Sequence, residues 1–318
     1  MGSSWVPVVS LADADAAVPA IADACERVGF LTVVDHGVPA GVMTDLWDTA
    51  TAFFDLPDAD RRAVAMPFAG YPYGWSPFSY ETLTASIGET SPPDLKESYA
   101  IGPVDPPGHA FVDPDETSAW SPNLWPPALP ALRPAWETAF RRFAELSATL
   151  LSLMARALEL PPDHFAPLID RHTSAMRALN YPALTTAPRP GQQRAGAHTD
   201  YGTLTVLVAR PDQPGLQVQR PDGSWAAADP VPGGLVVNLG DAMARWTNDR
   251  WRSTMHRVVV GADASAARRQ SIAFFHNANW DARIECIPSC LAPGESPRYP
   301  PIEAGPHLMA KFRSTVGG

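Results

Sequence analysis

The spacing of hydrophobic positions changes along the chain, and this change separates two regions. Up to about residue 170, several segments repeat apolar residues every three or four positions, which is typical of amphipathic helices. The longest covers residues 134–158, and we expect this helix to pack against the outside of a sheet. From residue 174 onward, short apolar runs are separated by Pro, Gly and Asp, which is typical of strands joined by turns. The pattern predicts helices first and a β-rich region second.

The periodicity assigns most of both regions to individual elements. In the first region, strands are predicted at residues 6–10 and 30–34, and helices at 13–27, 42–55, 58–65 and 163–169. In the second region, strands are predicted at residues 176–181, 196–199, 204–209, 216–219, 235–239, 251–260 and 270–277. Pro221-Asp222-Gly223 has the chemistry of a hairpin turn, and residues 303–312 predict a C-terminal helix. About eight short strands with such turns favour a jelly roll, in which two sheets face each other and enclose a site.

Residues 67–130 lack a regular period and are rich in prolines and aromatic residues. Proline makes up 35 of the 318 residues, about twice the usual share, and the aromatic residues of this segment include Tyr73, Trp75 and Tyr80. Such a segment can be a stiff loop that packs over a sheet, or it can form a wall of a substrate pocket. The residues alone favour neither interpretation.

The composition is that of a globular, acidic protein. Hydrophobic residues make up 45% of the chain and charged residues 18%, without a low-complexity tract. The net charge of −10 argues against a nucleic-acid partner, because phosphates would be repelled, and it permits a cationic substrate. Nothing in the composition selects between a monomer and a homo-oligomer.

The sequence shows no recognisable targeting segment or membrane span. Residues 1–11 lack a basic stretch followed by a long apolar one, so no secretory signal is expected. The longest apolar stretch, residues 150–160, is interrupted by Ser152 and Arg156 and is too short to cross a bilayer. The cysteines form an odd, scattered set and predict free thiols in a reducing compartment. We therefore expect a cytoplasmic protein without a membrane partner.

The candidate chemistry is concentrated around a His-x-Asp pair. His198 and Asp200 are two positions apart, so on a strand their side chains point to the same side and can reach one ion. His256 follows much later and has to come from another strand. Two imidazoles and one carboxylate on one face of a metal leave the opposite positions open, as in non-haem Fe(II) oxygenases. By itself, a His-x-Asp pair is weak evidence, and His256 could be a core histidine.

A second pair of residues predicts a cosubstrate. Arg269 and Ser271 are again two positions apart on a predicted strand. A guanidinium matches a carboxylate bidentately, and the hydroxyl adds one more donor. A metal triad combined with such a carboxylate clamp is what binding of a 2-oxo diacid requires.

Further segments accompany these residues. Three of them precede or contain His256, namely residues 238–241, 246–248 and 252–258. Three others lie in the first region, namely residues 29–38, 53–57 and 94–98. As a set and in this order, they resemble the 2-oxoglutarate/Fe(II)-dependent dioxygenases of the isopenicillin N synthase-like superfamily, over most of the chain. The resemblance implies a mostly β fold with flanking helices, built on a double-stranded β-helix core of the cupin-like jelly-roll type. It also implies Fe(II), 2-oxoglutarate as cosubstrate, and O2.

The resemblance assigns roles to individual residues. It implies that two imidazoles and a carboxylate bind Fe(II) and carry the catalysis, namely those of His198, His256 and Asp200. It also implies that three donors bind the far carboxylate of 2-oxoglutarate, namely Arg269, Ser271 and Tyr181. Some members carry Asn two positions before that Tyr, where this chain has Leu179, so we expect the clamp to be looser or rearranged. Candidate substrate-pocket residues are Arg177, Phe275, Tyr73 and Tyr80. A surface position for Arg177 and core packing for Phe275 are the alternatives.

We expect a single structural unit. Residues 1–170 would form an N-terminal segment with the substrate-loop region at about 67–130, residues 171–300 the Fe(II)/2-oxoglutarate core, and residues 301–318 a C-terminal helix. The expected reaction is hydroxylation, desaturation, epoxidation or oxidative cyclisation of a small molecule, with release of succinate and CO2. The breadth of the family favours secondary metabolism, including antibiotic biosynthesis.

Two alternatives stay open at this point. An Fe(II) oxidase of the same fold that does not use 2-oxoglutarate, such as isopenicillin N synthase, also carries Arg-x-Ser. A non-catalytic binding protein on this fold is the other alternative. Stoichiometric succinate would separate the first from the expected reaction, and complete absence of O2 uptake would favour the second.

Overall fold

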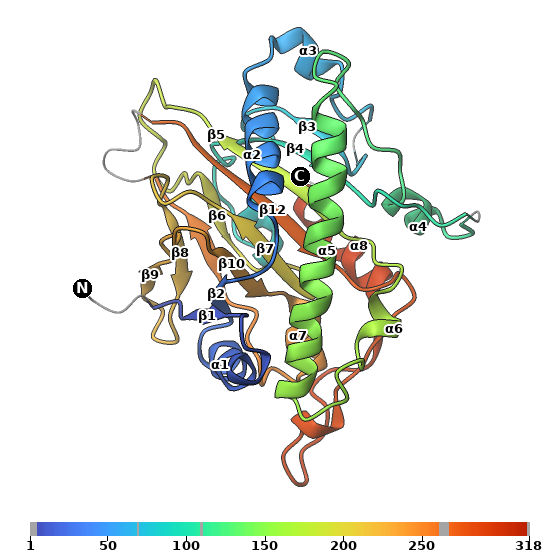
Figure 1. The fold of residues 1–318 in the computed structure, drawn as a ribbon. Helices are drawn as coiled ribbons and strands as arrows, with labels where there is room; N and C mark the ends of the chain where they lie inside the picture. Colours follow the sequence, from blue (N-terminus) through green and yellow to red (C-terminus); the bar gives the residue numbers. More distant parts are fainter. Residues whose placement is uncertain (1–4, 69, 109–110, 261–266, 317–318) are drawn as a thin grey trace.

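Two facing sheets form the centre of the protein, and helices cover the outer side of the larger sheet (Figure 1). The computed structural model describes residues 5–68, 70–108, 111–260 and 267–316. In this part of the chain the larger sheet has the strand order β1-β2-β10-β7-β12-β5-β4-β3, and the smaller sheet the order β6-β11-β8-β9. The arrangement confirms the jelly roll that the strand pattern predicts.

Both regions of the sequence contribute strands to the larger sheet. Its strands are β1 (Val8–Ser10), β2 (Phe30–Val34), β10 (Leu235–Leu239), β7 (Leu204–Val208), β12 (Arg269–His276), β5 (Ala175–Tyr181), β4 (Glu97–Ile101) and β3 (Gly74–Ser76). The smaller sheet consists of β6 (Ala195–His198), β11 (His256–Val258), β8 (Leu216–Gln219) and β9 (Trp225–Ala227), and a separate pair is β13 (Arg283–Ile284) with β14 (Ile302–Glu303). Because β2 pairs with β10 and β4 pairs with β5, strands from the first region of the sequence extend the larger sheet, whose other strands come from the second region.

The longest helix, α5 (Leu132–Ala157), lies along the outer face of the larger sheet (Figure 1). It contacts α1 (Ala14–Arg27) and α2 (Ala40–Phe54). Phe140 and Phe143 of α5 meet Phe274 of β12, with ring centroids 5.0 and 5.9 Å apart. Burying each such ring contributes roughly 1.5–3 kcal/mol. The remaining helices are α3 (Asp58–Arg62), α4 (Pro114–Ala119), α6 (Ala166–Ile169), α7 (Asp241–Trp246) and α8 (Ala304–Val316), with 3-10 turns η1 (Leu83–Ile87) and η2 (Pro288–Cys290).

Strand alternation on β12 divides its side chains between two layers. Phe274 faces the helices, so Arg269, Ser271 and Phe275 point to the opposite face, toward the smaller sheet. Tyr181 of β5 is the register partner of Arg269 and shares this inner face. Tyr181 belongs to an apolar cluster that includes residues of both sheets. The inner face of β5 and β12 therefore lines the space between the sheets.

The strand predicted at residues 251–260 is wrong in its length, because only β11 (His256–Val258) pairs with neighbours. The residues before it are held by the end of α1. The backbone N–H of Arg252 donates to the carbonyl of Cys25 at 3.1 Å, and the Thr254 hydroxyl donates to the carbonyl of Val28 at 2.7 Å. These tertiary partners replace the strand neighbours that local β propensity would favour.

The segment 67–130 contains regular elements that its sequence does not reveal, namely β3, η1, β4 and α4. All five residues of β4 are buried, so the alternation of apolar and polar positions that marks a half-exposed strand is absent. The hairpin at Pro221-Asp222-Gly223 is confirmed, since it joins β8 to β9, although β9 itself is not among the predicted strands. The helix α7 is likewise unpredicted.

Candidate active site

His198, Asp200 and His256 come together at one end of the smaller sheet. His198 ends β6, His256 begins β11, and the two are direct register partners, with ring centroids 4.3 Å apart. Asp200 lies in the turn after β6. Its Oδ1 is 3.9 Å from Nε2 of His198 and 3.8 Å from Nε2 of His256. One ligand atom from each residue lies within 4.8 Å of the others.

Backbone carbonyls set the tautomer of both histidines. Nδ1 of His198 is 2.7 Å from the carbonyl oxygen of Gly196, and Nδ1 of His256 is 3.1 Å from that of Thr254. A carbonyl oxygen only accepts, so each Nδ1 carries the proton and each Nε2 keeps a free lone pair. Burial, together with the neighbouring His256, lowers the pKa of His198 to about 3, which keeps its imidazole neutral. Neutral imidazoles are the form that binds metal.

The two oxygens of Asp200 have different environments. Oδ2 accepts from the hydroxyl of Thr205 at 2.6 Å and from Nδ2 of Asn238 at 2.7 Å, and both donors are buried. Oδ1 faces the two histidines. Burial alone would raise the pKa of Asp200, but His256, His198 and the two donors lower it, so the carboxylate is ionised. A fixed carboxylate oxygen beside two Nε2 lone pairs is a donor set that fits Fe(II).

Arg269, Ser271 and Tyr181 form a second cluster on the inner face of the larger sheet. Arg269 is 2% exposed; its Nη1 donates to Ser271 Oγ at 3.2 Å and its Nε donates to the carbonyl of Pro214 at 3.1 Å. Its guanidinium lies 4.9 Å from the ring centre of Tyr181. Among the ion pairs of the described residues, none includes Arg269. A buried cation that has hydroxyl and carbonyl partners but no acidic partner is suited to an anionic ligand.

The four predicted pocket residues occupy different environments. Phe275 faces inward and is the register partner of Thr205, which holds Asp200. Arg177 also faces inward, and its guanidinium pairs with Glu81 at 2.8 Å. Tyr80 is 45% exposed on the loop next to Glu81. Tyr73 is buried, and its hydroxyl donates to the carbonyl of Ala119 in α4, so the structure does not bring it to the other three.

Several charged residues near the site are absent from the set that the sequence suggests. Lys96 directly precedes β4 and is 3% exposed, with Glu81 and Asp94 as partners. Burial alone would raise the pKa of Glu81, but Arg177 and Lys96 lower it to about 2. Lys96 lies two positions before Ser98 and four before Ala100, and this period-two spacing is the signal that could have placed Lys96 on the inner face with them.

Arg194 is a further buried cation beside the second cluster. It is 3% exposed, and its Nη2 donates to the carbonyl of Ala267 at 2.8 Å. Burial, followed by the like charge of Arg269, lowers the pKa of Arg194. Two neighbouring arginines reinforce the positive potential at this end of the inner space.

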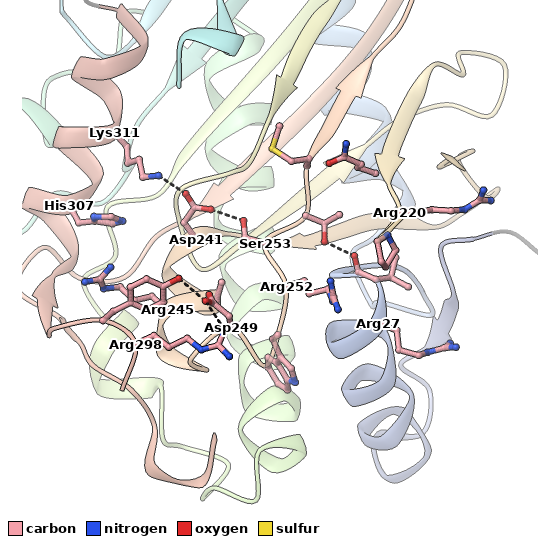
Figure 2. Close-up of a pocket in the computed structure, with 18 residues that line it drawn as sticks. Arg27, Arg220, Asp241, Arg245, Asp249, Arg252, Ser253, Arg298, His307 and Lys311 are labelled. Carbon is pink, nitrogen blue, oxygen red and sulfur yellow. Dashed lines mark hydrogen bonds and ion pairs between the residues drawn. The ribbon is translucent and has the colours of Figure 1, made fainter. Parts of the chain in front are cut away.

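A groove of about 850 Å³ lies beside the segment that leads into His256 (Figure 2). The charged residues of its lining are mostly basic, with Arg27, Arg220, Arg245, Arg252, Arg298 and Lys311 against Asp241 and Asp249. Figure 2 shows Lys311 and Ser253 pointing toward Asp241. Lys311 Nζ donates to Oδ2 of Asp241 at 2.9 Å, and Ser253 Oγ donates to its Oδ1 at 2.7 Å. The three candidate metal ligands do not line this groove. We therefore place the reaction centre between the sheets.

The C-terminal helix α8 lies beside the turn that carries Asp200. Phe312 meets the ring of Tyr201 edge-on, with centroids 5.9 Å apart, and Lys311 lies 5.7 Å from the same ring. The helix also contacts η1. In the part of the chain that the structure describes, α8 and the other helices are too short or too polar to cross a membrane.

Comparison with known proteins agrees with this site. The family model described as the 2OG-Fe(II) oxygenase superfamily matches residues 173–278, and the one described as non-haem dioxygenase in morphine synthesis N-terminal matches residues 6–128. The first match contains all three candidate metal ligands together with Arg269 and Ser271. The second contains β1 to β4 and the loop that carries Glu81.

Curated relatives and solved structures cover nearly the whole chain. The 2-oxoglutarate-Fe(II) type oxidoreductase hxnY of Emericella nidulans is 32% identical over 94% of this chain and 85% of its own length. The proline hydroxylase buaE of Petromyces alliaceus is 34% identical over 87% and 86%. The crystal structure of a full-length Neurospora crassa protein in complex with alpha-KG and thymine superimposes with a TM-score of 0.84 at 29% identity, covering 97% of this chain and 96% of that one.

These relatives support the reaction that depends on 2-oxoglutarate over the oxidase that does without it. The jelly roll, the His-Asp-His cluster and the two family matches lead to one conclusion: the chain belongs to the 2-oxoglutarate/Fe(II) oxygenase superfamily, as an oxygenase that uses Fe(II), 2-oxoglutarate and O2 to oxidise a small molecule.

Proposed function

We propose that Arg269, with Ser271 and Tyr181, binds the far carboxylate of 2-oxoglutarate, and that His198, Asp200 and His256 hold Fe(II). The observation that carries this proposal is the buried guanidinium of Arg269, which has hydroxyl and carbonyl neighbours but no ion pair among the described residues. Leu179 packs beside this cluster and supplies no donor, and the neighbouring Arg194 would add a second positive charge for the carboxylate. In this proposal, Arg194 takes part in the clamp in place of the Asn that some family members carry.

The residues of this chain position and shield the reactants. When bound, Fe(II) and 2-oxoglutarate supply the oxidising chemistry, in which O2 is consumed and 2-oxoglutarate yields succinate and CO2. The carbonyls of Gly196 and Thr254 keep both Nε2 atoms aimed at one point, and Thr205 with Asn238 keeps Oδ1 of Asp200 aimed there as well. Phe30 packs edge-on against His256 at 5.3 Å and excludes water from that side.

The prime substrate, we propose, is a small polar molecule with an amino group that binds near Arg177, Phe275 and Tyr80. The acidic group at this place is Glu81, which forms an ion pair with Arg177. The Glu81 side chain is 14% exposed and the Arg177 side chain 22%. An ammonium group can approach the same carboxylate. The relative named proline hydroxylase and the Neurospora crassa complex with thymine both point to small polar substrates.

The test is succinate formation by the purified protein with Fe(II), 2-oxoglutarate and O2. Candidate amines would be compared with their N-acetyl forms, which lack the positive charge, and thymine would serve as a neutral polar probe. We expect an amine to stimulate succinate formation in a 1:1 ratio with oxidised product, and its N-acetyl form to do so weakly. Oxidised product without succinate would instead identify a 2-oxoglutarate-independent oxidase.

The reaction outcome is expected to be a gain of oxygen or a loss of two hydrogens, and not halogenation. Non-haem iron halogenases replace the carboxylate ligand with a small residue, which frees a position for halide. Here Asp200 is present, ionised and held by two donors. Product mass after reaction in excess chloride or bromide checks this expectation, and a halogen isotope pattern from the wild-type protein would contradict it.

For its setting, we propose one structural unit that works in the cytoplasm, in secondary metabolism, without a nucleic-acid or membrane partner. The pairing of β2 with β10 and of β4 with β5 supports the single unit. Cys25, Cys286 and Cys290 are free thiols, which suits a reducing compartment and Fe(II). Limited proteolysis tests the unit, because cleavage into two stable halves near residue 170 would show separate domains.

A further inference from the structure

A chain of four alternating charges runs through the inner layer, from Arg177 on β5 to Asp94 in the loop between η1 and β4. Arg177 Nη1 lies 2.8 Å from Glu81 Oε1, Lys96 Nζ lies 3.2 Å from Glu81 Oε2, and Lys96 Nζ lies 3.5 Å from Asp94 Oδ2. Asp94 and Lys96 are 1% and 3% exposed. Groups this deeply buried are costly to keep charged, so each depends on its neighbours.

The buried end of this chain reaches the first metal-ligand strand. Asp94 Oδ1 accepts from the backbone N–H of Gly196 at 2.9 Å, and Asp94 Oδ2 accepts from that of Leu83 at 3.2 Å. The carbonyl of the same Gly196 accepts from Nδ1 of His198 at 2.7 Å. Asp94 therefore binds the backbone N–H of Gly196, and His198 binds the carbonyl of the same residue.

Gly196 is packed closely against these partners and has no room for a side chain. A Cβ placed on Gly196 would lie 2.7 Å from Cγ2 of Thr84 and 3.3 Å from Oδ1 of Asp94. The strand β6 is therefore pressed against η1, and its position depends on Asp94, which joins both through hydrogen bonds. Asp94 is in turn held by Lys96.

We propose that Asp94 and Lys96 are positioning residues for His198, which set the location and ring orientation of this ligand through the backbone of Gly196. The inference rests on the proposed role of His198 as an iron ligand. Outer partners of metal ligands commonly change metal affinity by about 10- to 100-fold when they are removed. In this chain the partner acts through one intervening residue and comes from the N-terminal region, far from the metal-binding motif in sequence.

The experiment measures Fe(II) binding by anaerobic titration, with Co(II) as an air-stable spectroscopic probe, alongside the melting temperature. Lys96→Met leaves Asp94 and Glu81 with only Arg177 as counter-charge, and we expect Fe(II) affinity to fall by about 10- to 100-fold. Asp94→Asn keeps the shape but offers one acceptor for two N–H groups, and we expect a loss of about 10-fold. The double variant restores charge balance, so its loss should be smaller than the product of the two single losses.

Glu97→Gln is the matched control, because Glu97 is a buried carboxylate directly after Lys96 that faces the outer layer. It binds Arg61, Trp75 and Asn180 there. We expect this control to lower the melting temperature without changing Fe(II) affinity. If Lys96→Met does not fold, the Fe(II) affinity of Asp94→Asn alone tests the positioning role.

Three outcomes are decisive, and the first two separate this inference from the proposed function. Unchanged Fe(II) and Co(II) affinity in Asp94→Asn, with wild-type affinity lost in His198→Ala, would overturn the positioning role and leave the triad intact. Equal affinity in wild type and His198→Ala would show instead that the triad assignment is wrong. An equal loss in Glu97→Gln would show a general effect of stability and would also overturn the inference.

Discussion

The Asp200→Asn variant is expected to fold normally and to lose turnover by at least about 10³-fold, together with most of its Fe(II). The reason lies in the two donors that face Oδ2. Thr205 and Asn238 require an acceptor at that position, so the oxygen of the introduced amide would turn toward them. The NH2 group of this amide would then point at the two Nε2 atoms, and an amide nitrogen with two protons has no lone pair to offer a metal.

Iron content, melting temperature and succinate formation check this prediction together. Asp222→Asn is the control, since Asp222 is an exposed turn residue whose bonds to Ser224 an Asn side chain can also make. We expect the control to behave like the wild type in all three measurements. Near-normal turnover with stoichiometric iron in Asp200→Asn would show that Asp200 is not a ligand.

The Arg269→Lys variant is expected to raise the apparent KM for 2-oxoglutarate roughly 10- to 100-fold while leaving Fe(II) binding unchanged. A hydrogen bond to a charged group contributes about 1.5–3 kcal/mol, and the ammonium group cannot reproduce the planar fork of the guanidinium. The loss of the contacts to Ser271 and to the carbonyl of Pro214 also frees the side chain to move. Steady-state kinetics with varied 2-oxoglutarate, and a separate metal titration, measure the two effects.

Arg268→Lys is the matched control for this change. Arg268 is the preceding residue but points to the other layer, where it bonds to Asn180 and Asp55. Its replacement by Lys should leave the KM for 2-oxoglutarate unchanged. If Arg269→Lys also kept the wild-type KM, the carboxylate of the cosubstrate would have to bind elsewhere, and the neighbouring Arg194 would become the candidate.

The sequence by itself determined the fold class and the inner face of β12. The strand pattern after residue 174 predicts the jelly roll, and three strands, β2, β8 and β10, lie at the predicted positions. The two-residue spacing of Arg269 and Ser271 predicts a shared face, and the structure places both on the inner side. Period-two spacing carries this information because strand geometry is local and does not depend on distant partners.

Only the tertiary structure decided which distant groups meet on that face. The sequence does not show that Oδ2 of Asp200 is occupied by Thr205 and Asn238, which leaves Oδ1 toward the histidines. It also does not show that Tyr73 turns to Ala119. Local pattern tells which side of an element a residue faces, whereas the partner on that side is set by chain segments that fold back from elsewhere.

The buried charges show this division most clearly. The sequence places Lys96 and Asp94 in a segment that resembles the family but does not show that they are buried, and in the structure, where η1 packs against β6, they are 3% and 1% exposed. A charged side chain is kept in such a place only when opposite charges and N–H donors surround it. Those partners, Glu81 and the backbone of Gly196, come from two other parts of the chain, so they exist as a set only in the folded protein.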